Sequence, residues 1–133
     1  VPTSIPGSPA NLLRLKSGNI LCVYRVMGAL GRKSGYAGRP VGYRGVLSYD
    51  EGKTWDVANE KVIRDDTLPG LVGYPSSVQL DDGTIFTLYN VLRVDKIKPE
   101  DNFQYKENLL VHPPLHSYIA GSLYTEDYIR PPG

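Results

Sequence analysis

A pattern of hydrophobic residues and glycine occurs twice in this chain, and this internal repeat limits the fold more than any other feature of the sequence. The first copy lies in residues 13–24 and the second in residues 78–89. Four pairs of identical residues stand 65 positions apart, namely Leu15 and Leu80, Gly18 and Gly83, Ile20 and Ile85, and Tyr24 and Tyr89. Because a shared offset indicates a repeated structural unit, we expect the two copies to fold alike.

Each copy predicts a β-hairpin, with a short strand, a tight turn that has glycine at its tip, and a β-rich return strand. Pro9 and Pro75 precede the two copies, where the start of a strand tolerates a missing N–H group. Residues 45–48 and 57–63 are expected to add a third and a fourth strand to the first unit, and residues 117–124 a third strand to the second. The second unit then ends without a fourth strand.

Four antiparallel strands in a meander make up one blade of a β-propeller. The sequence therefore predicts an all-β fold of about two four-stranded blades, with blade one over about residues 8–65 and an incomplete blade two over about residues 74–128. Propellers close with four to eight blades, and four units of this length would need about 260 residues. We expect the chain to be a fragment that lacks N-terminal blades, or to complete a ring with copies of itself, most simply as a trimer.

The segment between the third and fourth expected strands has the chemistry of a tight turn. It reads Ser48-Tyr49-Asp50-Glu51-Gly52-Lys53-Thr54-Trp55. An Asp side chain closes such a turn by accepting backbone N–H groups, and Gly52 can supply a positive φ. Thr54 and Trp55 are expected to open the next strand, with the indole lying across the turn.

This pattern, S-x-D-x-G-x-T-W, resembles the Asp-box of the bacterial neuraminidase repeat, and the chain is thereby similar to the sialidase superfamily. The resemblance implies a six-bladed propeller in which Ser48, Asp50, Gly52, Thr54 and Trp55 form a structural clasp that faces away from the active site. It covers most of the chain, because residues 73–85 also resemble a late sialidase segment that reads roughly Tyr-Ser-x-Leu-x-x-Leu-x-Asp-Gly.

In the sialidase family the tyrosine of that late segment is the catalytic nucleophile, and the resemblance implies this role for Tyr74. A phenol suits the task because sialic acid carries a carboxylate beside its anomeric carbon, which would repel a carboxylate nucleophile. In this chain Pro75 replaces the usual serine, and it is expected to hold Tyr74 in extended backbone. The structural alternative for Tyr74 is an aromatic residue packed at a blade edge.

The family also clamps the substrate carboxylate with three arginines, because a guanidinium group bonds a carboxylate through two parallel N–H groups. By position, Arg44 is the first candidate, Arg39 the second and Arg25 the third. Residues 1–49 contain seven bases and no acid, whereas residues 50–133 contain eight bases and 14 acids, so the halves carry charges of +7 and 8 − 14 = −6. This segregation favours an anionic ligand for the first half.

Because residues 1–49 contain no acid, they cannot supply the acid/base Asp that the family carries in an early blade. Two functions remain open: part of an exo-α-sialidase, a glycoside hydrolase for terminal sialic acid, or a non-catalytic glycan-binding module for acidic sugars. Nucleic-acid binding is less favoured, because the bases are spread over turns and loops and do not follow one strand or helix. The isolated chain is expected to be inactive.

The remaining signals are few. Cys22 is the only cysteine, so no disulfide can form within the chain, and its apolar neighbours predict a buried thiol. His112 and His116 are separated by Pro113-Pro114, which forbids a helix, so no metal site is predicted. No cofactor is expected, and no apolar run is long enough to span a membrane. An extracytoplasmic location is implied only by the family resemblance.

Overall fold

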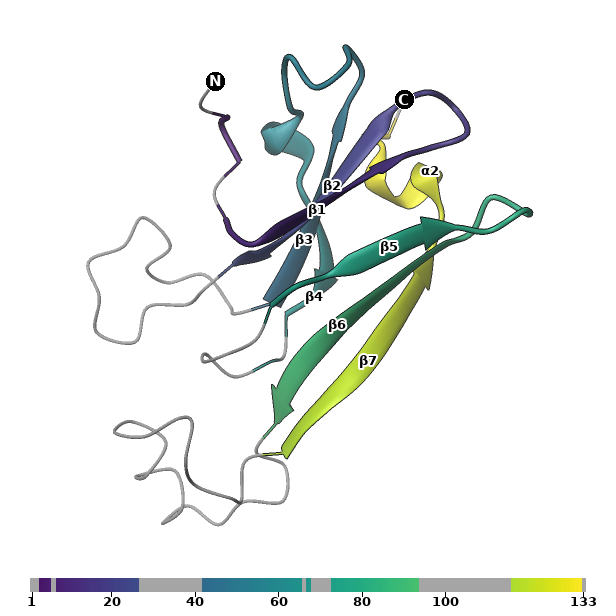
Figure 1. Cartoon of the computed structure of the whole chain (residues 1–133). Helices are drawn as coiled ribbons and strands as arrows, with labels where there is room; N and C mark the ends of the chain where they lie inside the picture. The colour runs from purple at the N-terminus through teal and green to yellow at the C-terminus, as the bar shows by residue number, and fades with distance from the viewer. Residues whose placement is uncertain are drawn as a thin grey trace.

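The computed structural model describes residues 3–5, 7–26, 42–65, 67, 73–93 and 116–132. Its strands form two antiparallel sheets, which pack face to face (Figure 1). The first sheet has the order β1 (Ala10–Arg14), β2 (Ile20–Val26), β3 (Gly42–Ser48) and β4 (Lys61–Arg64). The second sheet has the order β5 (Ser76–Gln79), β6 (Ile85–Arg93) and β7 (His116–Tyr124). The all-β expectation is confirmed, with short helical turns as the exceptions.

Both predicted hairpins are present, and their turns have the same geometry. Gly18 has a φ of 94° and Gly83 a φ of 93°, a left-handed conformation that favours glycine. The register also repeats at the offset of 65, because Arg14 pairs with Ile20 in the first hairpin and Gln79 pairs with Ile85 in the second. The repeat in the sequence is therefore a repeat in the structure.

The region around the fourth strand differs from the prediction. Residues 57–63 do not form one strand: Val57–Asn59 form a 3-10 helix (η1), and only Lys61–Arg64 join the sheet. The side chain of Asn59 donates to Asp56 Oδ1 at 2.9 Å, and its backbone N–H donates to the Asp56 carbonyl at 3.1 Å. These local bonds compete with strand formation, as Asp and Asn side chains commonly do. Thr54 and Trp55 likewise lie outside any strand.

A short helix that the sequence did not predict, α2 (Glu126–Ile129), follows β7. It returns the end of the chain to the first sheet, where the Tyr128 hydroxyl donates to the Val62 carbonyl at 2.6 Å. Ile129 is buried, and its Cδ1 lies 3.3 Å from the position that a Cβ on Gly45 would occupy. Gly45 therefore leaves the space that Ile129 fills.

The main core lies between the two sheets, where β2 and β3 of the first sheet meet β6 of the second. Tyr43 and Tyr89 stack across this interface with their ring centroids 4.6 Å apart. The buried members of the cluster are Leu15, Leu21, Val23, Tyr43, Leu47, Ile85, Tyr89, Val91 and Ile129. Since residues from both units contribute, the two sheets stabilise each other.

A second, smaller cluster covers the far face of the first sheet. Its buried members are Cys22, Tyr24, Val26 and Val46, with Ile5 and Trp55 packed against them. The predicted burial of the cysteine is confirmed, and desolvation raises the pKa of Cys22 to about 11. Ile5 of the N-terminal segment and the Asp-box tryptophan therefore cover part of this face of the first sheet.

Candidate acidic-sugar site

The loops and turns of the molecule lie at two opposite ends of its strands. The hairpin turns, the Asp-box and α2 lie at one end, which we name the turn end (Figure 1). At the other end β2 finishes, β3 begins and residues 73–75 lead into β5; we name this the Arg25 end. Six residue steps along β2 separate the two ends by roughly 20 Å.

Arg25 holds three segments together at the Arg25 end. Its Nε donates to the carbonyl oxygen of Ser8 at 3.0 Å. Its Nη1 lies 3.2 Å from the position that a Cβ on Gly73 would occupy, so the guanidinium rests directly against the Gly73 backbone. The strand that carries Arg25 therefore meets both the N-terminal segment and the segment that precedes β5.

Tyr43, the pairing partner of Arg25 across β2 and β3, forms the floor beside it. Its hydroxyl donates to the Asn90 carbonyl oxygen at 2.5 Å. Burial raises the pKa of Tyr43 to about 12, against smaller opposing effects of the Arg25 charge and of a hydrogen bond with the Gly73 backbone. Tyr43 is therefore a neutral phenol at pH 7. Sequence reasoning did not identify it, because the contact with Gly73 and Asn90 joins residues distant in sequence.

Tyr74 directly follows Gly73 in the chain and is 85% exposed. Its φ is 56°, so the expectation of extended backbone is wrong. Gly73 packs against Pro9 as well as Arg25, and the chain turns sharply at Tyr74 before it enters β5. A bulky residue at positive φ costs about 1–3 kcal/mol and occurs preferentially at functional sites. The alternative of a tyrosine packed at a sheet edge does not fit this exposure.

Arg44 lies on the opposite face of the first sheet from Arg25. Its pairing partner is Tyr24, which belongs to the second cluster, and successive residues of a strand point to opposite faces. Arg44 is only 4% exposed, and its Nη1 donates to the carbonyl oxygens of Tyr43 at 3.2 Å and Arg64 at 3.1 Å. The structure therefore does not bring Arg44 together with Arg25 and Tyr74.

The electrostatic partner of Arg44 is Glu60, which the sequence analysis did not single out. Arg44 Nε lies 3.8 Å from Glu60 Oε1, and Tyr24 donates its hydroxyl to the same carboxylate. Such an internal charge pair braces β3 against the start of β4, and removal of one partner would leave the other charge buried. Arg39, the second arginine candidate, lies outside the described residues.

At the turn end, the Asp-box forms the predicted clasp. The Asp50 carboxylate accepts hydrogen bonds from the Thr54 N–H at 2.8 Å and from the Thr54 hydroxyl at 2.7 Å. Ser48 Oγ donates to Asp50 at 2.9 Å and accepts the Gly52 N–H at 2.8 Å. The hydrogen bonds from Thr54, with smaller ones from Ser48 and Lys53, lower the pKa of Asp50 to about 2.

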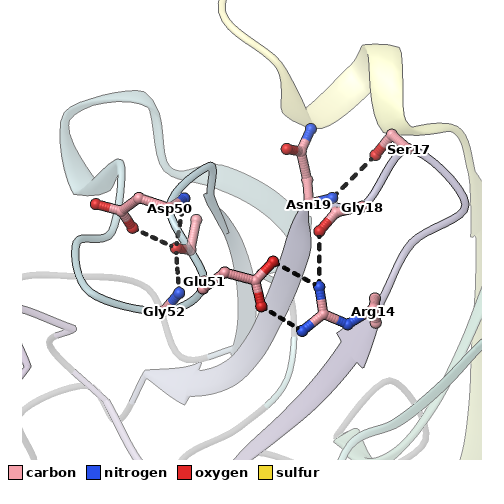
Figure 2. A network of polar contacts seen from close by, with 8 residues as sticks. Arg14, Ser17, Gly18, Asn19, Asp50, Glu51 and Gly52 are labelled. Atoms are coloured by element: carbon pink, nitrogen blue, oxygen red, sulfur yellow. Dashed lines mark hydrogen bonds and ion pairs between the residues drawn. The ribbon is translucent and has the colours of Figure 1, made fainter.

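The predicted roles of Gly52 and of the Trp55 indole are also confirmed, although Thr54 and Trp55 do not open a strand. Gly52 has a φ of 82°, and the Trp55 ring lies across the turn, 3.8 Å from the position of a Cβ on Gly52. Glu51 also has a positive φ, of 62°, and this presents its carboxylate to Arg14 in β1 at 2.9 and 2.6 Å (Figure 2). The clasp therefore also fastens the Asp-box to the first hairpin. It lies at the end of the sheet opposite to Arg25.

An open groove of about 310 Å³ is lined by residues of β4, β7 and α2. Val62 and Ile63 of β4 and Tyr128 of α2 contribute to its lining. Residues of β7 complete the lining, namely Ser122, Leu123 and Tyr124. The lining of the groove contains no charged side chain, so it offers no counter-charge to an anionic ligand.

Compared with protein-family models, with curated proteins and with solved structures, the chain matches none. Within the described ranges, no group of three or more His, Cys, Asp or Glu side chains is placed to hold a metal ion. His116 begins β7, whereas His112 lies outside the described residues. Among the helices of the described part, none is long and apolar enough to cross a membrane.

Proposed function

We propose that this chain belongs to a sialidase-like β-propeller and that its Arg25 end binds an acidic sugar of the sialic-acid type. The observation that carries the proposal is the backbone conformation of Tyr74. An exposed tyrosine at a φ of 56° directly follows the Gly73 backbone against which the Arg25 guanidinium rests. In this proposal the exposed aromatic residue offers an apolar surface to a sugar ring, and the nearby guanidinium offers a positive charge to its carboxylate.

The propeller part of the proposal is supported by the orientation of the two units. Leu21 and Val23 point from the first sheet into the shared core. Their counterparts 65 positions later, Phe86 and Leu88, point away from that core, on the other face of the second sheet. The two sheets are therefore stacked in the same orientation, as successive blades of a propeller are.

Binding is favoured over cleavage for this chain alone. Of the three arginine candidates, Arg25 is at the proposed site, Arg44 is an internal brace, and Arg39 is outside the described residues. A hydrolase needs an acid/base group placed within hydrogen-bond reach of the glycosidic oxygen in addition to a nucleophile. Residues 1–49, which include Arg25, contain no acid.

Binding can be tested by saturation-transfer NMR with a sialoside and, as a neutral comparison, the same glycan without its sialic acid. We expect transfer to the sialoside only, and a loss of most of that signal in Arg25→Gln. Arg14→Gln removes the same charge at the turn end and should leave binding intact. Equal losses in both variants would indicate non-specific charge attraction and contradict the assigned site.

Hydrolysis is the second candidate, favoured by the exposure of the Tyr74 phenol and by the resemblance of residues 73–85 to the nucleophile segment. We expect little or no turnover of a fluorogenic sialoside by the isolated chain. If turnover is measured, Tyr74→Phe should abolish most of it and leave sialoside binding in place, because only the reacting oxygen is removed. Turnover that survives Tyr74→Phe would exclude this tyrosine as the nucleophile.

A further inference from the structure

Tyr74 has a backbone conformation that its own local sequence opposes. A φ of 56° is unfavourable for a bulky residue, and Pro75 restricts the residue before it to extended backbone. A residue keeps such a conformation only where the surrounding structure fixes it. Contacts from other parts of the chain must therefore hold the segment that contains Tyr74.

Two kinds of contact reach this segment, and both meet Gly73. Pro9 Cγ and Arg25 Nη1 each lie 3.2 Å from the position that a Cβ on Gly73 would occupy, so they limit the space around its backbone. Such van der Waals contacts do not by themselves set the direction of a peptide group. The second contact is the hydrogen bond between the Tyr43 hydroxyl and the Gly73 backbone, and a hydrogen bond does have a direction.

The Tyr43 hydroxyl joins two segments through a single oxygen atom. Its one proton is donated to the Asn90 carbonyl oxygen at 2.5 Å. Its hydrogen bond with the Gly73 backbone is therefore one that it accepts, from the Gly73 N–H group. The backbone of Gly73 is thereby tied to β6, one residue before Tyr74.

The ring of Tyr43 is well fixed in the core. Its side chain is fully buried and stacks on Tyr89 with the ring centroids 4.6 Å apart. Its strand, β3, pairs with β2 on one side and β4 on the other. Because the ring cannot turn without opening the close-packed core, its hydroxyl stays in one position. A fully buried residue cannot touch a bound ligand, so any effect of Tyr43 on binding must act through another residue.

We propose that Tyr43 is the positioning residue of the Arg25 end: its hydroxyl fixes the Gly73 backbone, which in turn holds Tyr74 outward at positive φ. This role rests on the proposed function, because Tyr74 is the ring that would meet the sugar. Without the hydroxyl, Tyr74 would relax toward the extended backbone that Pro75 favours. The apparent affinity for a sugar would then fall with the fraction of molecules in which Tyr74 is in place.

Tyr43→Phe removes the hydroxyl and keeps the stacked ring. Tyr89→Phe is the matched control, because it removes a buried hydroxyl from the other ring of the same stack. The Tyr89 hydroxyl lies 2.6 Å from Ser122 Oγ in β7, and so it bonds a different part of the chain. A general loss of stability would affect both variants, whereas a positioning role would affect Tyr43→Phe alone.

Two NMR measurements separate these cases. At positive φ the amide proton and the Hα of a residue lie closer together than in extended backbone, so their nuclear Overhauser effect is stronger. We expect the strong effect at Tyr74 in the parent and in Tyr89→Phe, and its loss in Tyr43→Phe. The affinity for a sialoside should fall about tenfold in Tyr43→Phe only, as expected for one lost hydrogen bond.

Loss of the Tyr74 effect and of affinity in Tyr43→Phe alone supports the proposal. It would be overturned if Tyr43→Phe kept the strong effect, if Tyr89→Phe showed equal losses, or if the affinity stayed unchanged although the Tyr74 effect was lost. A parent chain that binds no sialoside would contradict the proposed function, and the Tyr74 measurement would still decide the positioning role.

Hydrogen exchange of the Gly73 amide in the parent decides the case in which Tyr43→Phe does not fold. A protected amide supports the proposal, because the Tyr43 hydroxyl is the group assigned to accept its hydrogen bond. An amide that exchanges at the rate of an unprotected group would show that this bond is absent and overturn the proposal.

Discussion

The two units of this chain contain the same hairpin, but the structure that follows the third strand differs between them. We name this following structure the closure of the unit. After β3 the first unit makes the Asp-box, in which the hydrogen bonds of Asp50 and Ser48 join residues no more than four positions apart. After β7 the second unit makes α2, and the Glu126 carboxylate accepts hydrogen bonds from Ser17 at 2.9 Å and Asn19 at 2.7 Å, more than 100 positions away. One closure is local and the other depends on the tertiary structure.

The electrostatics of the two closures follow the same division. The pKa of Asp50 is lowered by its neighbours in the turn. Burial alone would raise the pKa of Glu126, but hydrogen bonds from Asn19, Ser17 and Arg130 outweigh it and lower the pKa. The Asp-box can therefore form before the sheets meet, whereas the Glu126 site exists only once the second unit has packed on the first.

The largest effect should come from the long-range closure. Ile129→Ala removes a buried side chain of α2 from the core beside Gly45 and should lower the free energy of unfolding by about 2–5 kcal/mol. Ile119→Ala, in β7 and 68% exposed, is the control and should cost far less. Urea unfolding followed by Trp55 fluorescence measures both. Equal costs would mean that α2 does not anchor the second unit.

An intermediate effect should appear where the two units are alike. Gly18→Ala and Gly83→Ala each place a Cβ at a φ near 94°, with nothing within 4 Å of it, so only the backbone conformation is penalised. Each should cost about 1–2 kcal/mol, and the two costs should agree within about 0.5 kcal/mol. Denaturation of the two variants side by side measures this. A large difference would show that the two turns are not energetically equivalent.

The smallest effect should come from the local closure, and it should depend on pH. Asp50→Asn removes a carboxylate whose pKa in the folded chain is about 2, below its ordinary value of 3.8. A lowered pKa stabilises the folded state above the unfolded value, so the variant should be less stable above about pH 4. The difference should then shrink as the pH falls from 3.8 through about 2.

Thermal unfolding of Asp50→Asn and the parent between neutral and acid pH measures that difference. Asp81→Asn, the same change in the turn of the second hairpin, serves as the control. A difference from the parent that stays constant across this range would contradict the assigned role of the Asp50 charge.

The sequence predicted those parts of the fold that are set by short stretches of chain. Gly18 and Gly83 predicted the turns of the hairpins. The spacing of Ser48, Asp50 and Gly52 predicted the clasp, including the positive φ of Gly52. The fourth strand was placed too early because Asp56 and Asn59 form bonds that a strand pattern does not reveal. Helix α2 was missed because its burial depends on Gly45 in another strand.

The candidate site was predicted only in part, for a related reason. The sequence placed Arg25 at the end of a strand and Tyr74 before the next hairpin, and both lie at the Arg25 end. It could not place Arg44, because the face on which a strand residue lies depends on the register between β2 and β3, and a long connection separates these strands. A shift of one residue would have turned Arg44 toward the other face.

The sequence by itself determined the two hairpins, their shared register and the Asp-box, because turn residues and hydrogen bonds over a few positions fix these features before any packing occurs. Only the tertiary structure decided that Arg44 is an internal brace, that Tyr74 turns outward at positive φ, and that the second unit is anchored by α2. Each of these depends on which surfaces come together, and contacts between distant residues are not encoded in any local pattern.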